Sequence, residues 1–148
     1  MAGGNGNGTV SAALDTMVCD LLEDFLGALA EGENPGVLLC LEDGRANRYE
    51  AAFDEDGAEA CIEGAQRFVI QHAEGLPAEH LGVLDRYAYA YAGGVELEGG
   101  FEDAVLVSFY ERGMDTGYSA YVLYQGFGAG DGFMWSDPEP AGEEAPLI

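Results

Sequence analysis

Apolar residues recur at steps of three and four near the start of the chain, a pattern typical of an amphipathic helix. The helix is expected from about Ser11 to Ala30, with Thr9 or Ser11 as its N-cap and with Gly32 and Pro35 ending it. One face of this helix is therefore expected to be buried. Its apolar stripe consists of Val10, Leu14, Met17, Val18, Leu21, Leu22, Phe25, Leu26 and Leu29.

The next apolar segment, residues 37–41, has no polar alternation, which favours a central strand that is covered on both faces. Asp43 and Gly44 follow it, and this dipeptide is a strong signal for a two-residue hairpin turn. The returning strand is expected over about residues 45–53. Together these segments predict a β-hairpin with one strand in the interior of a sheet.

A second helical pattern follows the hairpin. Asp56 and Glu59 have the spacing of a capping box at its start, and Gly75 and Pro77 end it. The pattern again predicts one buried face, so this helix is also expected to pack on the sheet. The residues of that face are Cys61, Ala65, Phe68, Val69 and Leu76.

Strand patterns dominate the second half of the chain. Residues 83–92 contain three consecutive Tyr-Ala pairs, a strict period of two, while residues 104–111 and 118–125 are β-branched or aromatic. A last short strand is expected at residues 133–135. The connections are short, which favours antiparallel hairpins.

The predicted order is α-β-β-α-β-β-β(-β), a single α+β domain over residues 9–136 with two helices packed on a mainly antiparallel sheet. Residues 1–8 are expected to be a flexible leader, and residues 137–148 an acidic, proline-rich tail. The order resembles that of roadblock-type and profilin-like domains. This resemblance concerns topology alone and implies no functional residue.

The balance of charges narrows the choice of partners. The chain has no lysine and only five arginines against 28 acidic residues, a formal net charge of −23. Such a surface repels nucleic acids and anionic membranes and attracts cations and basic proteins. General solubility, as in a saline habitat, is the simpler explanation of the acidity. The alternatives are mimicry of a polyanion or docking of a basic partner, and drift without a function.

The cysteines favour a reducing compartment. Cys19, Cys40 and Cys61 are odd in number and lack a C-x-x-C spacing, so neither a disulfide framework nor a zinc knuckle is expected. The first eight residues lack the basic and apolar regions of a secretory signal, and no apolar run approaches the length of a membrane helix. The sequence therefore predicts a cytoplasmic protein.

The Tyr-Ala alternation is the most unusual local feature. It places Tyr87, Tyr89 and Tyr91 on one face of a strand, and Tyr110 on a neighbouring strand can extend that face. Because tyrosine combines an apolar ring with a hydroxyl, it is common at interfaces, and at least two of the three rings are expected to line a partly exposed binding surface. The alternative is that a helix or a loop covers these rings.

Two further residues are candidates for binding. Arg112 can pair with Glu111 or Asp115 to hold a turn, or it can bind a carboxylate of a partner. Trp135 lies in an apolar cluster with Phe133 that is expected to dock on the sheet, on a helix or on a second copy of the chain. Trp135 is therefore expected to contribute to stability or to dimerisation, and the tail after Pro138 to be dispensable for folding.

No motif indicates catalysis, a metal or a cofactor. His72 and His80 are the only histidines, and their spacing does not fit a metal site on a helix. The composition and the tyrosine stripe favour a non-enzymatic protein-interaction module. Its partner is expected to be another protein, which can be basic, or a second copy of the chain in a homodimer. The alternatives are a polyanion mimic that inhibits a basic protein, and a small enzyme whose site the sequence does not reveal.

Overall fold

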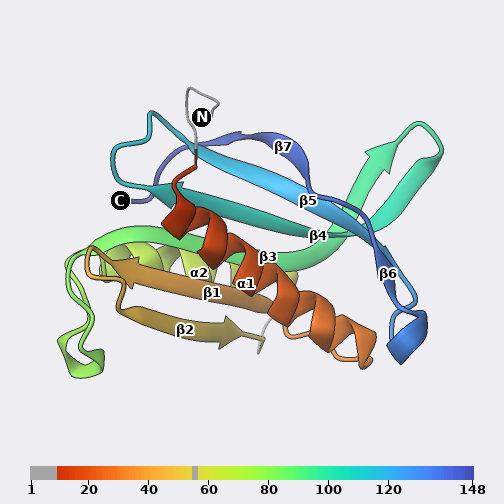
Figure 1. Ribbon diagram of the computed structural model, residues 1–148, viewed down its shortest axis with the longest axis horizontal. Helices are drawn as coiled ribbons and strands as arrows, with labels where there is room; N and C mark the ends of the chain where they lie inside the picture. The colour runs from red at the N-terminus through yellow and green to blue at the C-terminus, as the bar shows by residue number, and fades with distance from the viewer. Residues whose placement is uncertain (1–9, 55–56) are drawn as a thin grey trace.

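In the computed structural model, which describes residues 10–54 and 57–148, helix α1 (Ala12–Ala30) lies across one face of an antiparallel sheet (Figure 1). The side chain of Ser11 caps the helix by accepting a hydrogen bond from the amide of Leu14 at 3.0 Å. The predicted stripe faces the sheet, and Leu14, Met17 and Phe25 are fully buried. The 3.6-residue period therefore positions α1 as expected.

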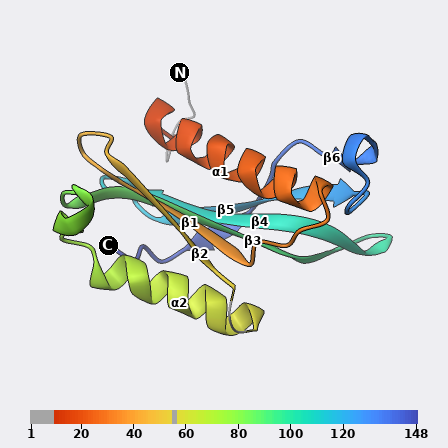
Figure 2. The same ribbon diagram turned by 90° about the horizontal axis from the view of Figure 1, so that it is seen from below.

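Helix α2 (Ala58–Gln71) covers the opposite face of the sheet (Figure 2). Cys61, Ala65 and Val69 are buried, and the ring of Phe68 stacks on that of Tyr49 with centroids 5.9 Å apart. The N-cap is Gly57, which supplies no side-chain hydrogen bond. Asp56 of the expected capping box lies outside the described residues.

The sheet contains seven strands in the order β2-β1-β3-β4-β5-β6, and β7 also pairs with β5. All the pairings are antiparallel. The predicted single α+β domain is confirmed, with one helix on each face of the sheet. The strands are β1 (Val37–Asp43), β2 (Arg48–Phe53), β3 (Leu84–Leu97), β4 (Gly100–Glu111), β5 (Gly117–Gln125), β6 (Met134–Trp135) and β7 (Glu139–Glu144), with short 3₁₀ turns at Pro77–Glu79 and Gly130–Gly132.

The Tyr-Ala alternation on β3 separates two apolar cores. Ala88 and Ala90 are fully buried beneath α1, where their small side chains let the helix approach closely. Tyr87 and Tyr89 belong to the core on the α2 face. A strand directs successive side chains to opposite faces, so the central strand β3 contributes to both cores.

The turn between β1 and β2 is longer than the expected two residues, because Asp43 organises a loop over residues 44–47. Its carboxylate accepts hydrogen bonds from the amides of Arg45 and Asn47 and from the Asn47 side chain, at 2.9, 3.0 and 2.9 Å. A fourth bond, from the amide of Gly82 at 2.8 Å, ties this loop to the segment before β3. Burial by itself raises the pKa of Asp43, but these bonds outweigh it and lower the pKa to about 2.

The C-terminal segment belongs to the sheet, so the expected boundary at residue 137 is wrong. Residues Glu139–Glu144 form β7 along the outer edge of β5. Beyond β7, Leu147 and Ile148 pack against the core on the α2 face. No helix in the described part of the chain has the length and apolarity that a membrane crossing requires.

Candidate functional site

An apolar groove of about 470 Å³ runs between the C-terminal half of α1 and the segment that follows β5. Leu22 and Leu26 of α1 form one wall, and Phe133 and Trp135 form the other. Val122 of β5 also lines it. The remaining lining residues are Cys19, Glu23, Gly27, Ala30, Gly130, Ser136, Asp137 and Pro138.

The far wall is an arm, residues 126–138, that glycines shape. Gly126 has φ of +91°, and a Cβ at this position would lie 2.8 Å from the carbonyl oxygen of Gly132, so only glycine allows β5 to turn back here. The amide of Gly128 donates to the carbonyl of Leu29 at 2.8 Å and fixes the arm to the end of α1. Phe133 is buried and stacks on Tyr124, with centroids 5.7 Å apart. Phe133 therefore docks the arm, as expected, but Met134 and Trp135 of the same cluster do not dock and remain mostly exposed.

Gly27 of α1 lines the opposite wall of the groove and contributes no side chain to it. It lies within α1, and a Cβ built on it would meet no atom within 4 Å. Glycine in a helix costs about 1 kcal/mol relative to alanine. A side chain at this position would project into open space of the groove, which gives a way to fill the site without disturbing the fold.

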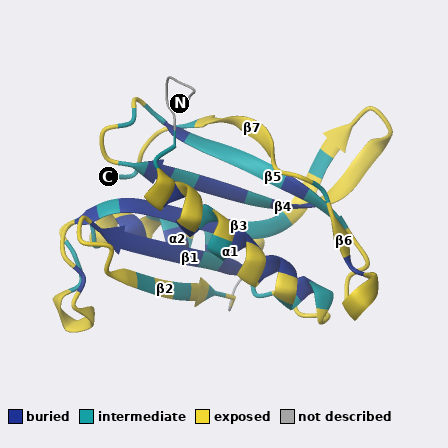
Figure 3. Cartoon of the chain, in the orientation of Figure 1, coloured by how far each residue is buried: buried dark blue, intermediate teal, exposed yellow. Residues whose placement is uncertain are grey.

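Large apolar side chains remain exposed around this end of the molecule. Trp135 and Met134 are each 61% exposed, and Phe127 of the same arm is 54% exposed. The hairpin between β3 and β4 projects from the same end and carries Phe101, which is 75% exposed (Figures 1 and 3). Such a concentration of exposed apolar surface beside a groove is typical of an interaction site.

The charged groups that line the groove are acidic. Glu23 and Asp137 lie in its lining, which contains no arginine. Burial, and then the nearby carboxylates of Asp15, Glu23 and Asp20, raise the pKa of the Cys19 thiol. Cys19 therefore remains a protonated thiol at neutral pH and is a poor nucleophile.

The tyrosines expected to form an exposed face are covered instead. Tyr87 and Tyr89 are each 3% exposed and Tyr110 is 7% exposed, so the prediction of a partly exposed surface is wrong for them. Only Tyr91 is half-buried. Burial also raises the pKa of Tyr87 to about 12 and raises that of Tyr89, so both hydroxyls stay protonated at neutral pH. The alternative, a covered tyrosine face, is what the fold contains.

Arg112 lies at the opposite end of the sheet from Trp135 and has a structural contact. Its Nε donates to the carbonyl oxygen of Leu84 at 2.6 Å, and its amide donates to that of Asp85 at 2.8 Å. Within residues 10–54 and 57–148, its guanidinium forms no ion pair with Glu111 or Asp115. The structure thus brings the four tyrosines together but separates Arg112 and Trp135 from them and from each other.

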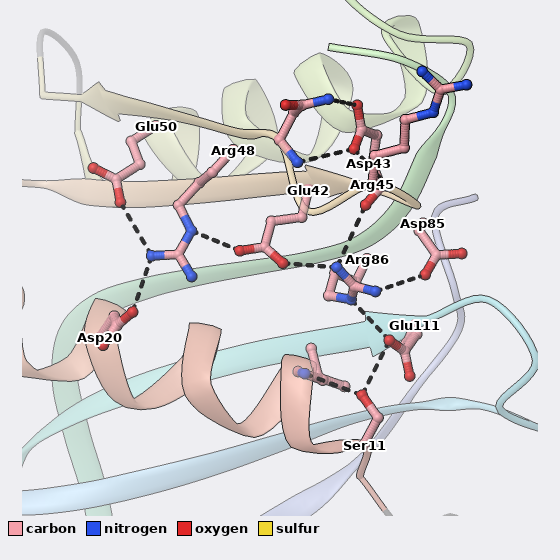
Figure 4. Close-up of polar contacts among 12 residues, drawn as sticks. Ser11, Asp20, Glu42, Asp43, Arg45, Arg48, Glu50, Asp85, Arg86 and Glu111 are labelled. Atoms are coloured by element: carbon pink, nitrogen blue, oxygen red, sulfur yellow. Dashed lines mark hydrogen bonds and ion pairs between the residues drawn. The ribbon is translucent and has the colours of Figure 1, made fainter.

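A buried cluster of charges around Arg86 was not foreseen from the sequence (Figure 4). Its guanidinium contacts Glu42 and Glu111 at 2.7 Å each and Asp85 at 2.9 Å. Ser11, the N-cap of α1, donates to Glu111 at 3.1 Å and joins the helix to this cluster. Asp85 is adjacent to Arg86 in sequence, but Glu42, Glu111 and Ser11 lie in distant segments. No local sequence motif therefore reveals the cluster. The cluster is saturated with internal contacts and serves the fold.

No group of three or more His, Cys, Asp or Glu side chains in the described ranges is arranged to hold a metal ion. Comparisons with protein-family models, with curated proteins and with solved structures gave no match. A function is therefore inferred from the geometry and charge of the groove beside α1.

Proposed function

We propose that this chain is a non-enzymatic protein-interaction module whose groove beside α1 binds an apolar segment with basic flanks. The observation that carries the proposal is the groove itself, with the apolar walls of Leu22, Leu26 and Phe133 and the largely exposed Trp135 at its edge. Trp is enriched among the residues that dominate binding energies at interfaces. Trp135 is therefore the expected anchor.

The charge of the molecule supports a basic partner. Glu23 and Asp137 line the groove, and the whole chain carries −23. Complementary charge accelerates association and excludes acidic competitors, while the apolar walls supply the affinity. Two copies of this chain repel each other, so a different, basic protein is a better partner than the homodimer that the sequence left open. The cytoplasm is the proposed location, because Cys19 and Cys40 are free thiols.

A titration with a short amphipathic peptide of leucine and lysine tests the proposal. Trp135 is the only tryptophan, so its emission reports the groove directly, and binding should shift the emission to shorter wavelength. Gly27→Leu fills the groove and should weaken binding about tenfold or more, a change of about 1.4 kcal/mol. Because leucine is a better helix former than glycine, the variant should not lose stability.

Ala60→Leu is the matched control. It adds the same side chain at an exposed position of α2, on the other face of the sheet, and should bind the peptide like the original chain. Polylysine, which has no apolar side chain to place in the groove, should bind both variants equally. If Gly27→Leu binds the leucine-lysine peptide as tightly as the original chain, the groove is not the site.

A further inference from the structure

The face of the sheet that carries α2 is covered by two different elements. α2 packs against β1, β2 and β3. The rest of this face, near Tyr87, is reached by the C-terminal segment, residues 139–148, which we call the strap. Its first part, β7, pairs with the edge of β5, and its last residues, Leu147 and Ile148, pack over the face. Figure 2 shows the end of the chain on the α2 side of the sheet.

β7, the first part of the strap, is poorly suited to be a strand. Its sequence is Glu-Pro-Ala-Gly-Glu-Glu, and all its residues except Glu144 are exposed. Pro140 lacks an amide hydrogen, Gly142 has φ of +144°, and the pairing with β5 shifts register between Ser119 and Ala120. Neither strand propensity nor burial therefore holds β7 in place.

The strap is held by the contacts of Glu144. Its carboxylate accepts hydrogen bonds from the hydroxyls of Ser108 at 3.0 Å and Tyr89 at 3.5 Å. The hydroxyl of Thr116 donates to its carbonyl oxygen at 2.9 Å. Tyr89 also accepts a bond from Gln66 of α2 at 2.9 Å, which fixes its hydroxyl. The side-chain donors to this carboxylate are thus neutral hydroxyls, held by the body of the domain.

A second anchor lies three residues further on. The amide of Leu147 donates to the hydroxyl of Tyr87 at 3.1 Å, and the side chains of Leu147 and Ile148 are half-buried against the tyrosine core. The body of the domain thus offers a strand edge, a pocket of hydroxyls for a carboxylate, and an apolar surface. Proteins that bind extended peptides by strand addition use the main chain of a strand edge for affinity and pockets for alternate side chains for specificity.

We propose that the strap is a displaceable occupant of a peptide-binding site, and that an extended segment of a partner protein can replace it. The segment carries a carboxylate followed three residues later by an apolar pair, as Glu144 is followed by Leu147 and Ile148. Displacement of the strap uncovers Tyr87, Tyr89 and Ser108 for the incoming segment. This site is separate from the groove beside α1 and selects a partner of different chemistry.

The test uses the full chain with a weakened strap. Glu144→Ala combined with Leu147→Ala removes the carboxylate bonded by Ser108 and Tyr89 and most of the apolar side chain of Leu147, so it weakens the strap but leaves every residue of the receiving surface unchanged. A fluorescently labelled peptide with the sequence of residues 138–148 should bind this variant about tenfold more tightly than the original chain, measured by fluorescence polarisation. Glu143→Ala, at an exposed neighbouring position, is the matched control and should bind like the original chain.

Two further measurements separate this site from the groove. The labelled peptide and the protein are both acidic, so added NaCl should strengthen their binding, whereas it should weaken binding of a basic peptide in the groove. Gly27→Leu in the weakened-strap chain should leave binding of the labelled peptide unchanged. Equal binding of the labelled peptide to the original and weakened-strap chains would overturn the proposal.

Hydrogen exchange on the original chain gives an independent result if the double variant does not fold. Amides of the strap should exchange through local opening, faster than the amides of β3 and β4 by about a hundredfold or more. If the paired amides of the strap exchange only together with those of the core, the strap opens only when the whole domain unfolds. It is then a fixed part of the fold, and the proposal is wrong.

Discussion

Glu42 and Asp43 are adjacent carboxylates at the end of β1, and both are almost completely buried. Glu42 is stabilised by two guanidinium groups, those of Arg48 at 2.6 Å and Arg86 at 2.7 Å. Asp43 is stabilised by amide groups instead, including that of Gly82. A buried charge is tolerated only when it is paired or fully hydrogen-bonded, so each carboxylate depends on a segment distant in the chain.

Arg86→Met should therefore be strongly destabilising. It leaves Glu111 without a cation and Glu42 with Arg48 alone, in a region where Arg86 itself is only 7% exposed. Removing one partner from a buried ion pair costs about 3–5 kcal/mol, and the free energy of unfolding measured in urea should fall by about that amount. Arg67→Met changes the net charge equally at an exposed position of α2 and should cost less than about 0.5 kcal/mol. Equal losses in the two variants would show that net charge, and not the buried cluster, sets the cost.

At the scale of elements, the arm that follows β5 has a buried side and an exposed side. Phe133 is 7% exposed and packs in the core beneath α1, whereas Trp135, two residues later, is 61% exposed. From the sequence, the whole apolar cluster of this arm was expected to dock, and Trp135 to contribute to stability or to dimerisation. The structure assigns the role of anchor to Phe133 and leaves Trp135 at the edge of the groove.

The two aromatic residues should consequently differ in their effect on stability. Phe133→Ala removes a buried ring and should lower the free energy of unfolding by about 3–5 kcal/mol. Trp135→Ala removes a mostly exposed ring and should cost less than about 1 kcal/mol. Urea denaturation followed by circular dichroism measures both variants without relying on tryptophan emission. A larger loss for Trp135→Ala than for Phe133→Ala would mean that Trp135 is the residue that holds the arm.

At the scale of the whole molecule, negative charge dominates. The net charge is −23, and two of the five arginines, Arg48 and Arg86, are engaged in ion pairs within the fold. Many surface carboxylates therefore repel one another without a nearby cation. This repulsion opposes the compact state and is screened by salt, with a Debye length of about 10 Å at about 0.1 M.

The melting temperature should therefore rise when NaCl is raised from about 0.05 M to about 0.5 M, because screening weakens the repulsion. Differential scanning calorimetry measures the effect. Arg67→Glu replaces a positive charge with a negative one at an exposed site, which makes the net charge more negative by two, and it should make the dependence on salt steeper. A melting temperature that stays constant or falls would mean that the local ion pairs of Arg48 and Arg86 outweigh the global repulsion.

Local sequence patterns predicted both helices and every strand except β7, together with the direction of their side chains. The stripe of α1, the hairpin of β1 and β2, and the alternation of β3 all follow from local periods of 3.6 and 2, which fix side-chain direction within an element. The burial of Ala88 and Ala90 beneath α1 follows in the same way. The dense cluster around Phe133 also predicted that the arm docks.

What covers each face of the sheet depends instead on contacts between segments that are distant in the chain. The tyrosines of β3 were expected to line a partly exposed surface because tyrosine is common at interfaces. Instead, Glu144 of the strap reaches Tyr89 and Ser108, and Gln66 of α2 also bonds to Tyr89. The acidic, proline-containing sequence of the strap indicated a tail, because the intrinsic strand propensity of a segment does not show whether it pairs with a strand such as β5. The groove beside α1 and the cluster around Arg86 likewise consist of contacts between distant segments. Such contacts depend on how the elements pack together, and a local pattern carries no information about them.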